Sequence, residues 1–454
     1  MVKNKNETEA DVAENVMLGF TNTTYAPELI WQKMTLKNAG VSLIDCDHRT
    51  PSHADEGYPY IAIPQLKNGH ITLEGVRLIS KSDYLDWTKK LKPQEDDVIV
   101  VRRCNSGDSA VVPRGLECAI GQNLVILRAD GTTVNPKFLR WLIRGPGWWE
   151  QVKKYINVGA VFDSLKCREI PQYELLIPPL VHQKEIATIL GALDDRITLL
   201  RETNTTLEAI AQALFKSWFV DFDPVHAKQQ GREPEGMDAA TAALFPDSFE
   251  ESELGLMPDG WKLSTVQESF ILTMGQSPPG HTYNESGEGI PFYQGRTDFG
   301  FRFPTQRIFC TAPTRLAEFG DVLVSVRAPV GDVNMAMEKC CLGRGVAGLR
   351  HSKNYKSFAF YTARGLQTRF HLFNSEGTVF GSINKKDFQG LPVIKPTPDV
   401  MQIFDEIASP LDSKIIENEK QIRTLTTLRD TLLPRLISGQ LRLPDAEAML
   451  EETT

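Results

Sequence analysis

The sequence predicts an α/β chain in which two mixed α+β lobes alternate with two long coiled-coil helices, arranged lobe-helix-lobe-helix with pseudo-two-fold symmetry. The hexapeptide GAVFDS at residues 159–164 returns as GTVFGS at residues 377–382, an offset of 218. The segments that follow the two hexapeptides match each other at the same offset without a gap. Both of these segments carry a heptad pattern. Because solenoid repeats are only about 20–50 residues long, a period of this size indicates duplicated globular lobes.

Length and cysteine content limit the class of protein. A chain of 454 residues suits about two to four domains, so two lobes with their own cores fit. Seven cysteines without a C-x-x-C pair favour reduced structural thiols over disulfides or zinc ligands, and we expect no metal site. No segment approaches the roughly 20 apolar residues of a membrane span, and the N-terminus lacks an apolar signal core. We therefore expect a cytoplasmic protein.

The negative net charge is concentrated in one segment. Residues 221–259 hold ten acidic and two basic side chains, a net charge of −8. The whole chain has the same net charge, −8. Residues 30–180 carry 20 basic against 17 acidic side chains, and residues 260–398 carry 16 against 10. Mildly basic lobes joined by acidic connectors permit local contact with DNA without establishing it.

Within each lobe, short β-rich runs alternate with Gly, Pro and Asn, which predicts small strands joined by turns. The clearest runs are residues 60–63, 98–101, 124–127 and 322–326, and apolar periodicity predicts helices at 136–152 and 357–373. The resulting organisation is an N-terminal extension (1–24), a first lobe (25–180), a first long helix (181–220), an acidic linker (221–259), a second lobe (260–398), a second long helix (399–440) and a C-terminal tail (441–454).

After each lobe, apolar residues recur at heptad spacing over about five heptads, which predicts a coiled-coil seam. At about 1.5 Å per residue, 33 residues form a rod of about 50 Å. The alternative is a pair of long amphipathic core helices without a coiled coil. The seam positions are Leu190, Leu193, Ile197, Leu200, Asn204, Leu207 and Leu214 in the first helix and Leu411, Ile415, Asn418, Ile422, Leu425 and Leu432 in the second.

Two features distinguish the helices from simple apolar rods. Asn204 and Asn418 lie on the seam, where a buried amide can fix the register; simple exposure of both side chains is the alternative. The first helix runs into an aromatic cluster that starts at Phe215 and includes Phe222. We expect the second helix to break at Pro434 and to stop near Gly439.

Several catalytic motifs are missing from the sequence. It has no glycine-rich turn for S-adenosylmethionine with a D/N-P-P-Y/F loop, and no G-x-x-x-x-G-K-[ST] phosphate loop. Pro398-Asp399 with Asp412 and Lys414 imitates a nuclease P-D…D-x-K pattern, but Asp412 and Lys414 fall on the heptad helix. We expect them to form a solvated helix face, and we expect no catalytic residue in the chain.

Four segments carry a close resemblance to a known family: PLVHQKEIATILGALDDRI (179–197), ALFKSWFVDFDPVHAK (213–228), ALFPDSFEESELGLMPDGW (243–261) and LRDTLLPRLISGQL (428–441). In these segments and in its layout, the chain resembles the specificity (S) subunit of type I restriction-modification enzymes over residues 25–443. The resemblance implies two target recognition domains that read a bipartite, asymmetric site in double-stranded DNA. It also implies helical regions that dock two methyltransferase (M) subunits and restriction/translocase (R) subunits. S-adenosylmethionine, ATP and Mg are then expected in those partners, and no cofactor in this chain.

Because recognition domains of this family vary where they touch bases, the candidate DNA contacts come from the residues alone. Arg and Lys suit guanine, and Asn and Gln suit adenine, in the major groove. For each residue the alternative is an exposed polar group or an internal salt bridge, and Arg103 and Arg327 follow the equivalent Asp97 and Asp321. The base-contact candidates lie at ends of short strands: Gln65, Lys67, Asn68, Arg102, Arg103 and Asn105 in lobe one, and Gln294, Arg296, Thr297 and Arg327 in lobe two. The phosphate candidates are Lys166, Arg168, Lys385 and Lys386.

Other functions fit part of the pattern. A standalone DNA-binding repressor would also need two reading lobes and a rod, but it would act without partner subunits. A coiled-coil scaffold for proteins would ignore DNA sequence. The missing motifs disfavour a single-chain modification enzyme.

Overall fold

The computed structural model describes residues 31–159, 162–253, 255–375 and 381–451. The expected N-terminal extension, residues 1–24, lies outside this range. The chain forms two compact units. Unit 1 ends at Ile197 and resumes at Thr424, whereas unit 2 runs from Thr198 to Arg423. Each unit therefore contains one lobe together with part of both long helices.

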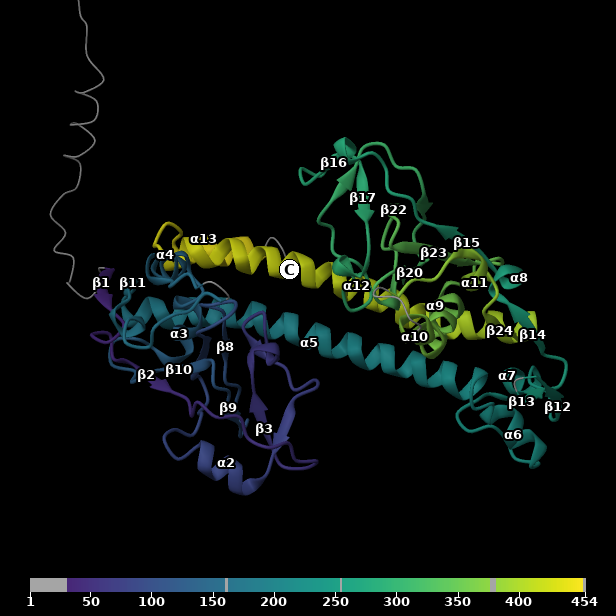
Figure 1. The fold of residues 1–454 in the computed structure, drawn as a ribbon, viewed down its shortest axis with the longest axis horizontal. Helices are drawn as coiled ribbons and strands as arrows, with labels where there is room; N and C mark the ends of the chain where they lie inside the picture. The colour runs from purple at the N-terminus through teal and green to yellow at the C-terminus, as the bar shows by residue number, and fades with distance from the viewer. Residues whose placement is uncertain (1–30, 160–161, 254, 376–380, 452–454) are drawn as a thin grey trace, which may run out of the picture. The chain divides into compact units, whose positions relative to one another are not determined.

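The two long helices are α5, Leu180–Phe219, and α12, Pro398–Ile437, each of 40 residues (Figure 1). At about 1.5 Å per residue each is about 60 Å long. Together with the mixed lobes described below, they confirm the predicted fold class. None of the helices in the described part of the chain is long and apolar enough to cross a membrane.

Within unit 2 the two helices run antiparallel. Asn418 Nδ2 donates to Asn204 Oδ1 at 2.8 Å, and further along α5 the ring of Phe215 lies 5.6 Å from that of Phe404. As the residue number rises along α5, the number of its partner in α12 falls, which is the pattern of antiparallel helices. In unit 1 the ends of the same helices are joined by an ion pair between Asp194 and Arg429.

Most seam positions are excluded from water. Asn204 and Asn418 are buried at 0% and 1% exposure, so they do not face solvent, and Asn204 Nδ2 donates to Glu419 Oε1 at 2.9 Å. Leu207, Leu214 and Leu411 are partly buried. The remaining predicted seam residues are buried: Leu190, Leu193, Ile197, Leu200, Ile415, Ile422, Leu425 and Leu432.

Lobe one is built around a four-stranded sheet of order β2-β10-β7-β8 and a three-stranded sheet of order β6-β3-β9. Strand β1 pairs with β11 and so joins the beginning of the lobe to its end. The elements are β1 Gln32–Thr35, β2 Val41–Asp45, β3 Tyr58–Ile61, η2 Ile63–Gln65, β4 Leu66–Lys67, β5 His70–Ile71, β6 Arg77–Ile79, α2 Lys81–Trp87, β7 Val98–Val101, β8 Ser109–Val111, β9 Ala119–Ile120, β10 Leu124–Ala129, α3 Pro136–Leu142, α4 Pro146–Tyr155, η3 Ile170–Gln172 and β11 Glu174–Ile177.

Lobe two repeats this topology with additions. Its four-stranded sheet has the order β15-β23-β20-β21, and the three central strands of its second sheet, β16-β18-β17-β22-β19, keep the two pairings of the three-stranded sheet in lobe one. The elements are β14 Lys262–Thr265, α8 Val266–Ser269, β15 Phe270–Met274, η4 Gly280–Thr282, β16 Tyr283–Asn284, β17 Ile290–Tyr293, η5 Arg296–Asp298, β18 Phe309–Cys310, β19 Leu316–Ala317, β20 Val322–Val326, β21 Val330–Met335, β22 Cys340–Leu342, β23 Val346–His351, α9 Lys356–Gly365, α10 Gln367–Ser375, α11 Lys385–Gln389 and β24 Pro392–Lys395.

The equivalence of the lobes is clearest at two strands. Strand β3 pairs antiparallel with β6 and parallel with β9, and β17 pairs in the same way with β18 and β22. Strands β14 and β24 close lobe two as β1 and β11 close lobe one. The internal repeat of the sequence is therefore a repeat of strand pairing.

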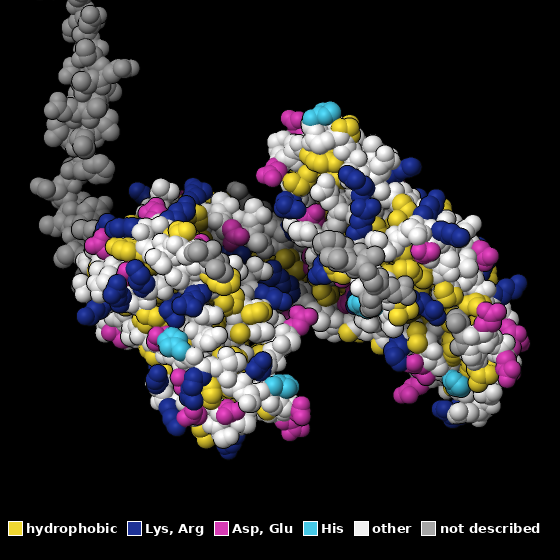
Figure 2. All heavy atoms as spheres, viewed as in Figure 1, with side chains coloured by type: hydrophobic (Ala, Val, Ile, Leu, Met, Phe, Trp, Pro, Cys, Tyr) yellow, Lys and Arg dark blue, Asp and Glu magenta, His cyan; other side chains and the backbone are white. Residues whose placement is uncertain are grey.

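The acidic segment between the lobes is folded. It contains α6 Asp223–Gln229, α7 Ala239–Ala243, β12 Phe249–Ser252 and β13 Gly255–Pro258. Val225, Phe245 and Met257 from this segment are buried in the core of unit 2. Its acidic side chains remain at the surface, where they gather over α6 to β13 (Figure 2).

Three local expectations are wrong, namely the helix break at Pro434 and the unbroken helices at 136–152 and 357–373. Helix α12 continues through Pro434 to Ile437. The proline removes one hydrogen bond of the helix and crowds the carbonyl four residues before it, but only three helical residues follow it. At the helix end, Trp31 Nε1 donates to the Ile437 carbonyl at 2.9 Å. Gly439, with φ +75°, follows the end of the helix. The helices expected at 136–152 and 357–373 are each split in two, before Pro146 and at Leu366. The C-terminal tail contains α13, Leu443–Glu451.

The amide pair of the seam gives a stability test. We expect Asn418→Leu to lower the free energy of unfolding by about 1–3 kcal/mol, because the buried Asn204 amide loses a partner. Asn204→Leu combined with Asn418→Leu should recover most of that loss, since no buried amide is then left unpaired. Urea unfolding measures both, with the exposed Ser413→Leu as control. A double variant less stable than the single one would contradict the pairing.

Candidate nucleic-acid interface

The repeated hexapeptides of the two copies end beside equivalent strand ends. Ser164 forms an isolated β-bridge with Arg103, just after β7, and Ser382 forms one with Arg327, just after β20. Backbone hydrogen bonds flank both bridges, from Leu165 N to the Arg102 carbonyl at 2.9 Å and from Ile383 N to the Val326 carbonyl at 3.1 Å. Residues 160–161 and 376–380, which belong to these repeated loops or precede them, lie outside the described range.

This pairing brings basic residues from distant parts of each lobe together. Lobe one contributes Arg103, Lys166 and Arg168, and lobe two contributes Arg327, Lys385 and Lys386; all six side chains are exposed. Within this set, Lys166 lies 3.4 Å from Glu169. We call these two sets the basic clusters of lobe one and lobe two. Exposed cations on backbone held by hydrogen bonds are suited to phosphate contacts.

The proposed internal ion pairs of Arg103 and Arg327 are made by other residues. Asp97 is buried and is held by Arg128, with Oδ1 2.7 Å from Nε. Asp321 is held in the same way by Arg350 at 2.5 Å. Among the described residues Arg103 and Arg327 have no ion-pair partner. The side chains of Arg103 and Arg327 are thus free to contact a ligand from the two basic clusters.

The remaining candidates of lobe one divide into buried and exposed residues. Gln65 is 8% exposed, and its Oε1 accepts a hydrogen bond from Ala62 N, so its side chain holds the local turn of the backbone. Arg102 is half-buried, whereas Asn105 is exposed. Lys67 and Asn68 are exposed in the β4–β5 hairpin. The left-handed φ of Asn68 (53°) and Gly69 (86°) is typical of the two-residue turn that such hairpins prefer.

In lobe two, Gln294, Arg296 and Thr297 are exposed and lie directly after β17, the equivalent of β3. Arg296 Nε lies 3.0 Å from Asp332, which restrains this side chain. The surviving base-contact candidates of the two lobes therefore follow equivalent strands, although their local backbone differs.

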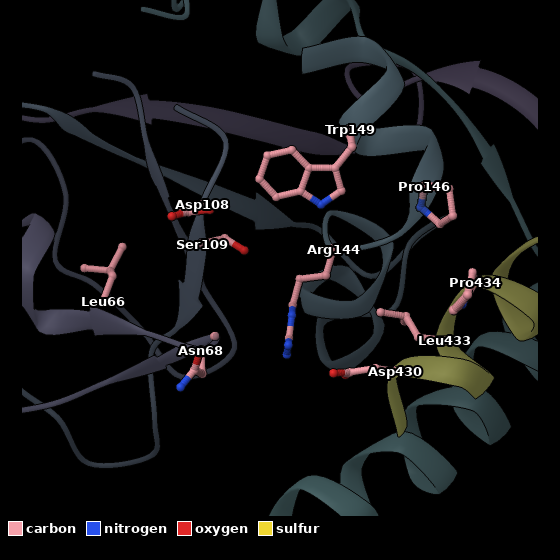
Figure 3. Close-up of a pocket in the computed structure, with 11 residues that line it drawn as sticks. Leu66, Asn68, Asp108, Ser109, Arg144, Pro146, Trp149, Asp430, Leu433 and Pro434 are labelled. Carbon is pink, nitrogen blue, oxygen red and sulfur yellow. The ribbon is translucent and has the colours of Figure 1, made fainter. Parts of the chain in front are cut away.

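A cavity of about 490 Å³ adjoins the hairpin tip in unit 1. Asn68 and Gly69 face it from the hairpin, Trp149 from α4, and Asp430 from α12, with Arg144 in the middle (Figure 3). Burial, together with the neighbouring Arg429, lowers the pKa of Arg144. A Cβ on Gly69 would lie 2.7 Å from Arg144 Nη1, so the hairpin approaches Arg144 closely because residue 69 is glycine.

A buried carboxylate, missed by the sequence analysis, joins the same hairpin to α5. Asp194 is 0% exposed and receives His70 Nε2 at 2.8 Å, Arg429 Nη1 at 2.6 Å, and Arg140. Burial opposes ionisation of Asp194, but these three groups outweigh it and hold its pKa well below its usual range. Asp194 is therefore an ionised group at the junction of lobe one with both long helices.

Lobe two has a corresponding network around Arg302, which is 1% exposed. Arg302 pairs with Asp412 of α12 at 2.5 Å and with Glu208 of α5, and it lies 3.5 Å from the ring centre of Phe360. Burial opposes its charge, yet Asp412, Tyr361 and Glu208 hold its pKa above the ordinary value. Asp412 also accepts from Ser357 Oγ at 2.6 Å.

These contacts correct the interpretation of the nuclease-like pattern. Asp412 is 6% exposed and serves the Arg302 network, so it does not belong to a solvated helix face. Lys414 is exposed and pairs with Glu417 at 2.9 Å. The one signal in the sequence was that Asp194 and Asp412 occupy the same position in the two copies, at the offset of 218.

One group of potential metal ligands occurs in the described part of the chain, formed by Asp45, Cys46 and His48. His48 Nε2 lies 3.1 Å from Asp45, so these two already satisfy each other. Burial, with Asp45 beside it, raises the pKa of the Cys46 thiol to about 11, which disfavours the thiolate that metals bind. All seven cysteines are free thiols.

Comparison with known sequences gives a consistent result. The profile of the type I restriction modification DNA specificity domain matches residues 43–209 and again residues 258–426. The chain is 29% identical over 329 residues to a specificity subunit assigned to the MjaX type I restriction enzyme of Methanocaldococcus jannaschii, covering 71% of this chain and 72% of that one. It is 25% identical over 379 residues to the HindI specificity subunit of Haemophilus influenzae, covering 71% and 81%.

One solved structure resembles the fold as well. The S subunit of a type I restriction-modification system from M. genitalium is similar with a TM-score of 0.57 at 16% identity, over 91% of this chain and 98% of that one. The HsdS subunit from Thermoanaerobacter tengcongensis is 25% identical over 90% and 97% of the two chains, with a TM-score of 0.33.

The charge of Asp194 gives a pH-dependent prediction. At neutral pH we expect Asp194→Asn to cost about 3–5 kcal/mol of stability, because Arg429 loses its buried partner. The unfolded aspartate has a pKa of about 3.9 and the folded one a lower value, so this cost is fully present above the unfolded pKa and shrinks as the pH falls toward the folded one. Urea unfolding at several pH values measures it, with the exposed Asp195→Asn as control. A cost that stays constant down to low pH would contradict an ionised Asp194.

Proposed function

Because the chain belongs to the family of type I restriction-modification DNA specificity subunits, we propose that its two lobes read the two halves of a bipartite, asymmetric site in double-stranded DNA. The chain is a non-catalytic recognition subunit. The observation that carries the proposal is the pair of basic clusters, which occur at equivalent strand ends in two lobes of the same topology. The candidate base-contact side chains differ between the lobes, as Lys67 and Asn68 differ from Arg296 and Thr297, so two unlike half-sites are expected.

We further propose that α5 and α12 act as the spacer between the half-sites. Equivalent major-groove faces recur every ~34–36 Å along DNA. Helices of 40 residues are long enough to span that distance, and each contributes residues to both units. The antiparallel pairing within unit 2 supports the coiled coil that such a spacer requires.

The proposed partners are two methyltransferase subunits and restriction/translocase subunits, which would bring S-adenosylmethionine, ATP and Mg, in the cytoplasm. Apolar side chains on the outer faces of the long helices support docking. In unit 2, Leu199 and Ile210 of α5 are 52% and 51% exposed, and Ile407 of α12 is 40% exposed. Exposed apolar groups of this kind are typical of surfaces that partner proteins cover.

Single-molecule methylome sequencing tests the whole proposal. A host that carries this chain with its methyltransferase subunits should show methylated adenines in one motif of two unlike halves separated by unspecified bases. A host with the methyltransferase alone should lack that motif. A motif without a gap, or methylation independent of this chain, would contradict the proposal. A standalone repressor or a protein scaffold would give no methylation at all.

The basic clusters give a quantitative prediction for DNA binding. For the complex with its methyltransferase on a duplex of the identified motif, removing one phosphate contact should lower the log–log salt slope of binding by about 0.9. We therefore expect Lys385→Ala with Lys386→Ala to lower the slope by about 2 and to weaken binding to motif and non-motif DNA alike. Fluorescence anisotropy at several salt concentrations measures this. Lys89→Ala with Lys90→Ala, an exposed pair after α2, is the control, and an equal reduction there would argue against the assignment.

A further inference from the structure

In each lobe, a basic side chain from the segment after an equivalent strand contacts a carboxylate at the same position of a long helix. Asp194 on α5 and Asp412 on α12 are 218 residues apart, which is the offset of the repeat. Their partners also correspond, because His70 follows the end of β3 by nine residues and Arg302 follows the end of β17 by nine. Strands β3 and β17 are equivalent by their pairing. We call His70 and Arg302 the anchor residues.

The anchor residues lie in the segments that carry the proposed base contacts. Lys67 and Asn68 precede His70 in the β4–β5 hairpin, and Arg296 and Thr297 precede Arg302 in lobe two. The contact of each anchor residue with its carboxylate ties the segment to the helix that carries that carboxylate. The anchor residues thereby determine the positions of the exposed base-contact candidates in the same segments.

The two anchors differ in how firmly they are enclosed. The Arg302 side chain is fully buried, with carboxylates from both long helices and the Tyr361 hydroxyl at 3.1 Å. The His70 side chain is 32% exposed and, among the described residues, pairs with the Asp194 carboxylate alone, which it shares with Arg140 and Arg429. The hairpin of lobe one is held to β8 by a backbone hydrogen bond from Val111 N to the Gly69 carbonyl at 3.1 Å. Its anchor residue is less enclosed than Arg302, and the tip of the hairpin lines a cavity (Figure 3).

We propose that His70 and Arg302 are positioning residues that hold the base-contacting segment of each lobe on the spacer helices and so determine how strictly each half-site is read. This inference rests on the proposed function. His70 acts through Lys67 and Asn68, and Arg302 acts through Arg296 and Thr297. Loss of an anchor relaxes the recognition of one half-site and leaves the other unchanged.

The test compares methylomes of hosts that carry the methyltransferase with wild-type chain, His70→Ala or His70→Arg. The readout is methylation at sites with one mismatched base, scored separately for the two halves. We expect His70→Ala to raise mismatch methylation at least about five-fold in one half only, and His70→Arg to restore discrimination because arginine fills the equivalent position in lobe two. Tyr361→Phe, which removes one contact of Arg302, should relax the other half. His53→Ala, an exposed histidine of lobe one, is the control.

A second measurement separates this inference from the proposed function. Hydrogen–deuterium exchange of the chain in complex with its methyltransferase should show faster exchange at residues 66–71 in His70→Ala, wild-type rates in His70→Arg, and unchanged rates in β7 and β10. Absence of a bipartite motif for the wild-type chain would sink the proposed function, while the exchange rates still decide whether His70 holds the hairpin. Relaxation of both halves alike, or a hairpin whose exchange is indifferent to residue 70, overturns the inference.

Discussion

The attachment of the lobes to the long helices depends on two buried carboxylates, Asp194 on α5 and Asp412 on α12, whose burial costs free energy. A carboxylate away from water is tolerated only when cations and hydrogen-bond donors compensate its lost hydration. Asp194 and Asp412 are both buried, and in each case a lobe supplies compensating groups. The lobes are consequently joined to the helices through a few directed contacts as well as through apolar packing, and a displaced lobe would leave a buried charge without its partner.

The same helices make the two copies interdependent. Unit 1 includes the end of the second copy's helix, and unit 2 includes the end of the first copy's helix. Arg429 of α12 completes the Asp194 network in lobe one's unit, and Glu208 of α5 completes the Arg302 network in lobe two's unit. Neither copy therefore has its full set of charge partners alone. The duplication visible in the sequence is not a pair of autonomous domains.

Much of the architecture could be predicted because it depends on periodicity. Heptad spacing identified α5 and α12, and apolar runs identified β7 and β20, since both patterns are local. The burial of Gln65 and Asp412 could not be predicted, because each depends on groups distant in the sequence. Composition favours exposure for such residues, and only tertiary contacts reverse it. The contacts of His70 and Arg302 could not be predicted from the sequence for the same reason. The two residues differ in type and belong to no common motif, although they occupy equivalent positions in the two lobes.

That shared position limits how such chains can exchange parts. Recombination that replaced lobe two by a lobe with a neutral residue at the place of Arg302 would leave Asp412 without the arginine that pairs with it, and Glu208 with Arg364 alone. A donor lobe must therefore match its recipient helices in charge at one residue, whatever DNA it recognises. Whether a lobe is compatible with the helices of another chain therefore depends on the charge at the position of Arg302. That charge can be read from a single column of a sequence alignment.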